Sequence, residues 1–305
     1  MCGLFGFLHY GQDSIKNLKG LTNMLACESA VRGTDAAGIA FNSKDICILK
    51  EAKSAYQIQF KHSDNIKALT GHTRHSTQGS KKKNYNNHPF LGICKNSKFA
   101  LAHNGVLLND NELRRKYNLP STHIETDSYI AVQLLEHKKV LNAESIKFMA
   151  ESVEGSYSFS ILDDKNNIWL VKGDSPIEIL RFPEYKLYVY ASTEEILWRA
   201  LIETNLFSEI KAGRYEKIDI TEGEILKITP KGDLQRYLFE YTDYTPLGKC
   251  VRWDYGMYYD TSDYIDDLKS VAAYQGYSPE DIDSLLDNGF APEEIEEYIY
   301  CMGEV

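Results

Sequence analysis

The order of the strand-like and helical stretches is the feature that most constrains the fold of this chain. A buried first strand at 2–10 precedes a helical stretch at 14–31, and several short strands follow. Two adjacent stretches with helical periodicity then occupy 126–137 and 143–153, after which short alternating strands resume. A doubly wound parallel sheet would alternate strands and helices one by one. The pattern therefore predicts a layered α+β fold built on antiparallel sheets.

The last fifty residues have a different composition from the rest of the chain. Residues 254–305 hold fourteen Asp and Glu against one Lys, a net charge of −13, whereas the whole chain carries −10. A repeat with a period of thirteen relates "GYSPEDIDSLL" at 276–286 to "GFAPEEIEEYI" at 289–299. Ser278 suits an N-cap, with Asp281 placed to close a capping box. We predict a main domain at 1–248 and an acidic, Tyr-rich tail of three short helices at 249–305, which is either a small packed bundle or a docking module.

Several classes of protein are disfavoured by what the sequence lacks. No apolar run approaches the roughly 20 residues that span a bilayer, and the apolar start has no basic residues before it. The six cysteines form no C-x-x-C pair, and no phosphate-binding glycine motif occurs. The acidic tail would repel nucleic acid. We expect a soluble cytoplasmic protein with reduced thiols, no metal, no organic cofactor, and no nucleic-acid or membrane partner.

Cys2 is the first candidate for chemistry. Removal of Met1, which a small second residue permits, would leave Cys2 with both a thiol and a free α-amino group. An α-amine with an ordinary pKa of about 7.7–8.0 can accept the thiol proton, so that nucleophile and base belong to one residue. A cysteine in second position can also be an accident of sequence, and further motifs have to decide.

Five stretches in a fixed order favour the interpretation of Cys2 as a nucleophile. They are "MCGLFGF", "RGTDAAGIAF", "GHTRHSTQG", "HNG" and "ETDS", between Cys2 and Ser128. With the cysteine in second position, this set resembles the class II glutamine amidotransferases, whose glutaminase domain is an N-terminal nucleophile hydrolase. The motifs are most similar to those of glucosamine-6-phosphate synthase and amidophosphoribosyltransferase. The resemblance covers residues 2 to about 240 and implies a four-layer αββα sandwich with two stacked antiparallel sheets.

The resemblance also implies roles for residues that face the reacting amide. Cys2 would attack the side-chain amide carbon of glutamine and form a γ-glutamyl thioester. Asn104 and Gly105 would form the oxyanion hole, although Asn-Gly also favours a plain turn. Arg32 would position the nucleophile, or would form a structural ion pair with Asp35.

A second set of residues would bind the amino-acid end of the substrate. Arg74 would clamp the α-carboxylate, because a guanidinium pairs with a carboxylate through two hydrogen bonds. Asp127 would bind the α-ammonium, cap the following helix, or do both. Thr77 and His88 are further substrate-binding candidates, and His88 could equally be an ordinary loop histidine.

The stretch that follows Arg74 resembles the family's mobile loop, which closes over bound glutamine. It includes Gly79 and the polar run "SKKKNYNNHPF". Two positions depart from the family: His75 replaces a common tryptophan, and Gln78 replaces a common histidine. These departures put the coupling to an ammonia acceptor in doubt more than glutamine hydrolysis.

Three functions are compatible with this reading. The first is a glutaminase component that hydrolyses glutamine to glutamate and supplies ammonia to a synthetase or transferase on a separate chain, because no acceptor domain is recognisable after residue 248. The second is a hydrolase of other γ-glutamyl amides, which would use the same Arg74 and Asp127. The third is a non-catalytic glutamine-binding regulator, which the intact motif set disfavours.

Overall fold

The computed structural model describes residues 2–12, 15, 17–202 and 204–242, and in the tail residues 265, 268–269, 272–273, 277–287 and 295. The chain divides into two compact units, at 1–244 and 245–305. The predicted boundary at 248 falls outside the described residues. Within the described part of the chain, no helix is both long and apolar enough to cross a membrane.

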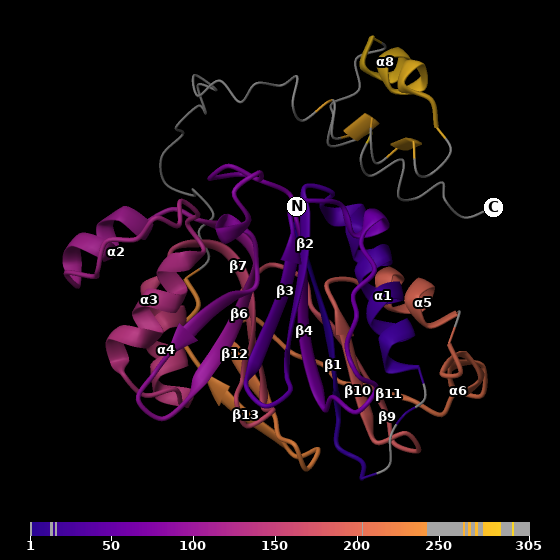
Figure 1. The fold of residues 1–305 in the computed structure, drawn as a ribbon, viewed down its shortest axis with the longest axis horizontal. Coiled ribbons are helices and arrows are strands. Elements are labelled where there is room, and N and C mark those ends of the chain that lie inside the picture. Colours follow the sequence, from indigo (N-terminus) through magenta and orange to yellow (C-terminus); the bar gives the residue numbers. More distant parts are fainter. Residues whose placement is uncertain are drawn as a thin grey trace. The chain divides into compact units, whose positions relative to one another are not determined.

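A seven-stranded antiparallel sheet forms one half of the first unit (Figure 1). Its strand order is β11-β9-β10-β1-β4-β2-β3. The strands are β1 (Gly3–His9), β2 (Ala36–Asn42), β3 (Ile46–Glu51), β4 (Ala68–Arg74), β9 (Glu178–Phe182), β10 (Leu187–Ala191) and β11 (Glu216–Lys217). The first strand of the chain thus becomes a central strand, and all seven of its residues are buried.

A six-stranded sheet forms the other half and is antiparallel throughout, with the order β13-β12-β8-β7-β6-β5. Its strands are β5 (Phe90–Ile93), β6 (Lys98–Leu107), β7 (Gly155–Asp163), β8 (Ile168–Lys172), β12 (Glu224–Ile228) and β13 (Leu234–Leu238). The alternating residues at 223–239, with Pro230, Lys231 and Gly232 between them, predict a hairpin, and β12 and β13 form it. Gly232 takes a φ of 85° at the turn, a value that glycine adopts at little cost.

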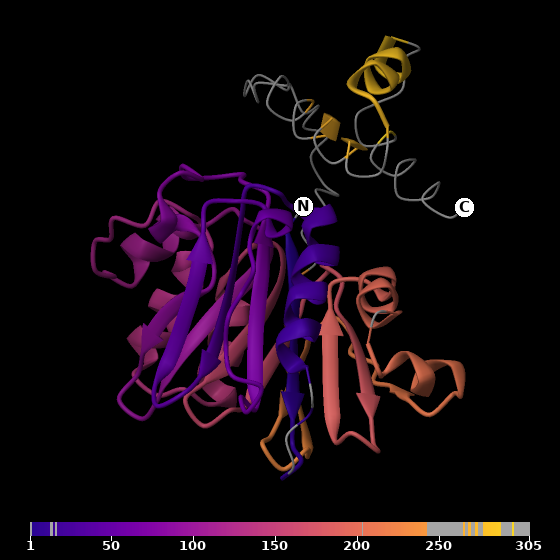
Figure 2. The ribbon, with the colours of Figure 1, turned by 45° about the vertical axis from the view of Figure 1, so that its right-hand side comes forward.

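Helices cover the outer face of each sheet (Figure 2). On the first sheet lie α1 (Leu18–Ser29), α5 (Glu194–Ile202) and α6 (Phe207–Lys211). On the second lie α3 (Tyr129–Lys138) and α4 (Ala143–Ser152), with α2 (Asp110–Lys116) beside them. Short 3-10 turns occupy Ala30–Arg32, Ala55–Gln57 and Asn84–Asn86. The α+β sandwich with two stacked antiparallel sheets is confirmed.

Three apolar clusters hold these layers together. One packs α1 and α5 on the first sheet, a second packs α3 and α4 on the second sheet, and the third lies between the sheets. The third cluster contains Leu4 and Leu8 of β1 together with Ala100 and Ala102 of β6. Since side chains alternate along a strand, the even-numbered residues of β1 and β6 face the gap between the sheets. The same alternation determines which candidate site residues on these strands face the gap.

The second unit is described for only a few segments. Helix α8 (Pro279–Asp287) begins at the predicted place, and the capping box is present: the Ser278 backbone N–H donates to Asp281 Oδ2 at 2.7 Å, and the Asp281 N–H donates to Ser278 Oγ at 3.2 Å. Ile282 packs with Leu268, Ala272 and Ile295. The other two predicted helices lie largely outside the described residues, and the role of the tail stays a prediction.

Candidate active site

Cys2 lies where the first strand begins, beside the end of β4. Gly3 pairs with Thr73, so the chain direction brings Cys2 opposite Arg74 and His75. The Cys2 sulfur is 3.4 Å from both the backbone N and the carbonyl O of His75. Burial raises the pKa of the Cys2 thiol, while the positive charge of the chain's amino end, the His75 N–H and Arg74 act in the opposite direction. The nucleophile candidate therefore needs a nearby base in order to ionise.

Arg32 contacts the backbone of this residue. Its Nε donates to the Cys2 carbonyl oxygen at 2.8 Å. Asp35, the alternative partner suggested by the sequence, instead accepts from Lys81 Nζ at 2.6 Å and from the Ser76 N–H at 2.7 Å. Arg32 thus contacts the backbone of the candidate nucleophile, and its positioning role stays a prediction.

Strand parity brings Asn104 of β6 to the same gap from the opposite sheet. Its side chain is 2% exposed, and its Nδ2 has no hydrogen-bond partner. A buried amide donor without a partner is costly, because it has lost water without replacement. An anionic oxygen placed here would satisfy it.

Gly105 follows with a φ of 132°, a backbone conformation that other residues rarely adopt. A Cβ at this position would lie 2.0 Å from the Ser156 carbonyl oxygen on β7. The glycine is therefore required by the close pairing of β6 and β7 and not by a turn, which corrects the alternative reading of "HNG".

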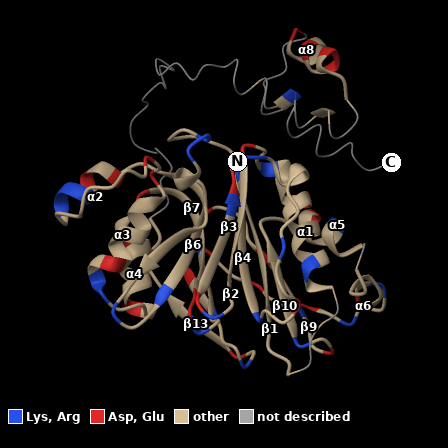
Figure 3. Cartoon of the chain, in the orientation of Figure 1, with Lys and Arg blue, Asp and Glu red and all other residues tan. Residues whose placement is uncertain are grey.

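Arg74 ends β4 and is 3% exposed. Strands β10 and β1 carry no Lys, Arg, Asp or Glu, and β4 carries only this one (Figure 3). Its Nη1 donates to Asn87 Oδ1 at 2.6 Å, and its Nη2 donates to the carbonyls of Gln78 and Gly79 at 2.7 and 3.1 Å. The guanidinium thus holds both ends of the 76–87 loop.

Asp127 is buried just before the N-cap of α3. Its Oδ2 accepts from the Leu107 N–H at 2.6 Å, and its Oδ1 accepts from Ser128 Oγ at 3.2 Å. These bonds differ from the predicted cap of the next helix. The charge of Asp127 opposes the effect of burial on Arg74 and raises the pKa of Cys2, so the three groups share one electrostatic environment.

The 76–87 loop is fastened to Glu125 as well as to Arg74. Glu125 accepts from Lys83 in a close ion pair, from Asn86 Nδ2 at 2.8 Å and from the Ser80 N–H at 3.3 Å. These bonds, above all that from Lys83, lower the pKa of Glu125 to about 2. Thr77 is exposed on the loop. The sequence reasoning missed Glu125, although it stands two positions before Asp127.

His88 is a buried residue and not an ordinary loop histidine. It is 4% exposed, both ring nitrogens lack a partner, and its ring lies 4.2 Å from that of His72 and 4.4 Å from that of Phe90, measured between centroids. Burial, with the nearby positive groups, holds the pKa of His88 well below its usual value. The sequence reasoning also missed His72, whose Nε2 lies 2.9 Å from the His103 carbonyl oxygen. Alternation along β4, which places His72 and Arg74 on one face, could have found it.

Comparison with known proteins gives the family of this arrangement. A family described as a glutamine amidotransferase domain matches residues 72–198. The chain is 32% identical over 188 residues to glutamine–fructose-6-phosphate aminotransferases of Staphylococcus aureus and Bacillus thuringiensis, an alignment that covers 58% of this chain and 30% of those relatives. This chain contains a class II glutamine amidotransferase domain. That domain belongs to a family of enzymes.

Two solved structures share the fold of the amidotransferase domain. Glutamine phosphoribosylpyrophosphate amidotransferase from B. subtilis aligns with a TM-score of 0.60, and a structure described as the allosteric regulatory enzyme of purine biosynthesis with 0.61. Both are 20% identical and cover 79% of this chain and 50% of the other chain. The present chain thus spans 30% of the length of its curated relatives and half the length of these neighbours.

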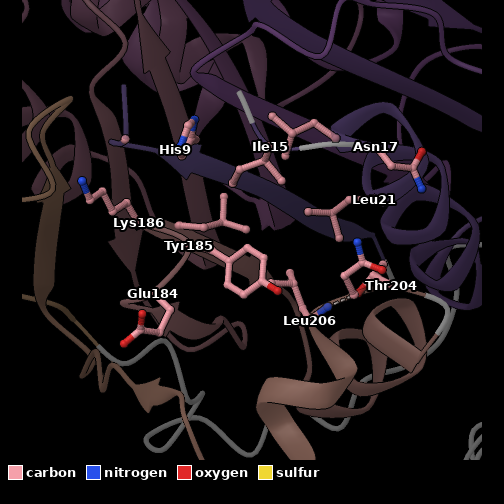
Figure 4. A pocket seen from close by; sticks show the side chains of 13 residues that line it. His9, Ile15, Asn17, Leu21, Glu184, Tyr185, Lys186, Thr204 and Leu206 are labelled. Carbon is pink, nitrogen blue, oxygen red and sulfur yellow. Dashed lines mark hydrogen bonds between the residues drawn. The ribbon is translucent and has the colours of Figure 1, made fainter. Parts of the chain in front are cut away.

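The amidotransferase domain also has a pocket remote from Cys2 (Figure 4). It has a volume of about 460 Å³ and lies at the other end of β1, about seven residues or roughly 23 Å along the strand from Cys2. Leu21, Tyr185 and Leu206 line it, and none of the predicted site residues does. Within the described part of the chain, no three His, Cys, Asp or Glu side chains are grouped as a metal site.

Proposed function

We propose that this amidotransferase domain hydrolyses the side-chain amide of glutamine through a thioester on Cys2, giving glutamate and ammonia. The observation that carries the proposal is that Cys2 and Arg74 lie at neighbouring strand ends of the first sheet, while strand parity turns the unpartnered Asn104 amide of the second sheet toward the gap between the sheets. Each comes from a different strand or strand end, and each has the chemistry that one step requires.

Removal of Met1 precedes the reaction and gives Cys2 a free α-amine. The amine takes the thiol proton, and the thiolate forms a bond to the amide carbon. The carbonyl electrons move onto oxygen, where Asn104 Nδ2 and the Gly105 N–H donate to the developing charge. The α-ammonium of Cys2 then gives its proton to the leaving nitrogen. The carbonyl re-forms, the C–N bond breaks, and ammonia departs, which leaves the γ-glutamyl thioester on Cys2. Water then cleaves the thioester, so that glutamate leaves and the thiol is restored.

The burial of the Cys2 thiol is the reason why the α-amine is needed as a base. Since burial raises the pKa of the thiol, an unassisted thiol would be mostly protonated at neutral pH. After removal of Met1 the terminal amine belongs to Cys2 itself, so the ammonium that forms when it takes the proton lies in the same residue as the sulfur. Coulomb attraction then favours the thiolate.

Arg74 and Asp127 recognise the α-carboxylate and the α-ammonium of the substrate. The Arg74 Nη2 donates to two neutral carbonyls of the loop, at Gln78 and Gly79. A carboxylate forms stronger, charge-assisted bonds with a guanidinium than a carbonyl does. Substrate binding therefore exchanges the loop carbonyls for the α-carboxylate and couples recognition to movement of the loop.

The ammonia acceptor is part of the proposal. The curated relatives are named as glutamine–fructose-6-phosphate aminotransferases, and that acceptor is a property of those proteins. We assign the acceptor to a synthetase or transferase on another chain. A cytoplasmic location stays a prediction.

The test is intact mass followed by glutamine hydrolysis without an acceptor. Wild type should lack Met1 and release glutamate. Cys2→Ala should release none, and Asn104→Ala should lose about 10²–10³ in kcat. The matched control is Cys47→Ala, a half-buried cysteine on the edge strand β3, which should retain full activity.

Other results have distinct meanings. An active preparation that retains Met1, or a Cys2→Ala variant that still releases glutamate, would refute the mechanism. Cys2-dependent release from γ-glutamyl anilides but not from glutamine would assign the site to γ-glutamyl conjugates. Glutamine binding without release from either would indicate a regulator.

A further inference from the structure

A buried chain of three side chains ends at Asp127. His103 Nδ1 lies 2.8 Å from Ser128 Oγ, and Ser128 Oγ lies 3.2 Å from Asp127 Oδ1. The three residues are 1%, 4% and 3% exposed. We propose that His103 and Ser128 are positioning residues, which hold the Asp127 carboxylate in the orientation that receives the substrate's α-ammonium. This inference rests on the proposed function, which gives Asp127 that role.

The protons along this chain have one consistent arrangement. An ionised carboxylate only accepts, so the single Ser128 hydroxyl proton points to Asp127. The Ser128 oxygen must then accept from His103, which places the imidazole proton on Nδ1. Burial lowers the pKa of His103, against the opposing effects of Asp127, the Ser156 backbone and Asp174, so the ring is neutral. Its Nε2 has no hydrogen-bond partner, which leaves the single proton on Nδ1. The chain therefore runs from His103 through Ser128 to Asp127 in a single direction.

Ser128 occupies a helix N-cap position but does not cap. Serine at this position ordinarily accepts from a backbone N–H of the first turn. Here the Ser128 side chain makes no such bond to α3. The hydroxyl is used for Asp127 and His103 instead, at the cost of the usual cap. A side chain placed only for helix stability would not be arranged this way.

The carboxylate is fixed from both sides. Ser128 holds Oδ1, and the Leu107 N–H holds Oδ2 at 2.6 Å. A carboxylate oxygen has two lone-pair directions, so each oxygen keeps capacity for an ammonium. Loss of the Ser128 bond frees the carboxylate to rotate, and part of the ammonium interaction is lost.

This role predicts a particular kinetic signature. The ammonium is bound equally in the ground state and the transition state, so a weaker contact raises KM and leaves kcat nearly unchanged. Glutaramate, which is glutamine without the α-amino group, makes no such contact. Only glutamine should therefore be affected when the chain is broken.

The experiment compares glutamine and glutaramate in the full chain. We expect Ser128→Ala to raise KM for glutamine about tenfold, as expected for one hydrogen bond to a charged group, and to leave kcat/KM for glutaramate unchanged. Ser128→Thr keeps a hydroxyl and should restore most of the glutamine affinity. The control is Thr126→Val, which removes a buried hydroxyl without a hydrogen-bond partner two residues away and should change neither substrate.

A binding measurement separates this inference from the proposed function. Calorimetry of glutamine in a Cys2→Ala background should show the same tenfold weakening on Ser128→Ala. If wild type binds glutamine without hydrolysing it, the proposed function fails and the positioning role stands on this weakening. Equal losses for both substrates, no loss for either, or no glutamine binding by the wild type would overturn the positioning role.

Discussion

Replacement of Gly105 by alanine should be far more harmful than replacement of another glycine with positive φ. Gly105 has a φ of 132° and Gly213 a φ of 67°. Both substitutions place a Cβ where L-residues rarely stand, which costs about 1–2 kcal/mol. They differ in what the new methyl group meets, and this difference makes Gly213→Ala a matched control.

The magnitude follows from the surroundings of each site. At Gly105 the Cβ would lie 2.0 Å from the Ser156 carbonyl oxygen and 2.9 Å from the Tyr157 Cα, whereas at Gly213 nothing lies within 4 Å. The β6–β7 pairing must therefore open, and overpacking of this kind adds about 1–3 kcal/mol. We expect Gly105→Ala to lose about 2–5 kcal/mol of unfolding free energy and Gly213→Ala about 1–2 kcal/mol.

The assay is urea unfolding followed by tryptophan fluorescence, with glutamine hydrolysis measured in parallel. Trp169 on β8 is 4% exposed and reports on the second sheet. Gly105→Ala should lower the midpoint and lose hydrolysis even where it remains folded, because Asn104 moves with the strand. Gly213→Ala should retain activity. Equal unfolding midpoints in the two variants would refute the steric argument.

Three further predictions follow from other contacts. Burial lowers the pKa of His72 to about 3 and that of His88 well below 6.5, so on acidification the unfolded chain binds protons that the folded chain does not. The free energy of unfolding should be full above pH 6.5 and should fall toward pH 4 by up to about 1.4 kcal/mol per pH unit for each histidine. His72→Asn should therefore flatten the slope of the urea midpoint against pH. Lys81→Met removes the ion pair to buried Asp35 and should raise KM for glutamine roughly fivefold. Lys82→Met alters the neighbouring exposed lysine and should leave KM unchanged. The same KM in both variants would exclude a role for the Lys81–Asp35 ion pair in loop closure. Ser278→Ala removes the N-cap of α8 and should destabilise this helix by about 1 kcal/mol. Amide hydrogen exchange in residues 279–287 should become faster, with no change in glutamine hydrolysis. Unchanged exchange would contradict the capping argument.

Local patterns in the sequence were sufficient to predict most of the secondary structure. Alternation predicted the β12–β13 hairpin, and helical periodicity predicted α3 and α4. Neither α2 nor α6 was predicted, since helices of seven and five residues are too short for a clear period. The motif set predicted the stacked sheets through resemblance, which periodicity alone could not specify.

Contacts between distant residues were beyond such patterns. Strand parity along β4 is visible in the sequence, but its register against β1 is not, and that register brings Arg74 beside Cys2. The bonds of Arg74 to its own loop, the burial of His88 and the use of Ser128 away from its helix depend on the packed state.

The sequence by itself determined which chemical groups are available: a thiol in second position, an arginine, an aspartate and an amide in "HNG". It also determined where strands form, because side-chain alternation is local. Only the tertiary structure decided that these groups are buried in one electrostatic environment and which of their hydrogen bonds are left unmade. Burial and strand register are properties of the assembled sheets, and a buried donor such as Asn104 Nδ2 lacks a partner only once the surrounding chain has excluded water.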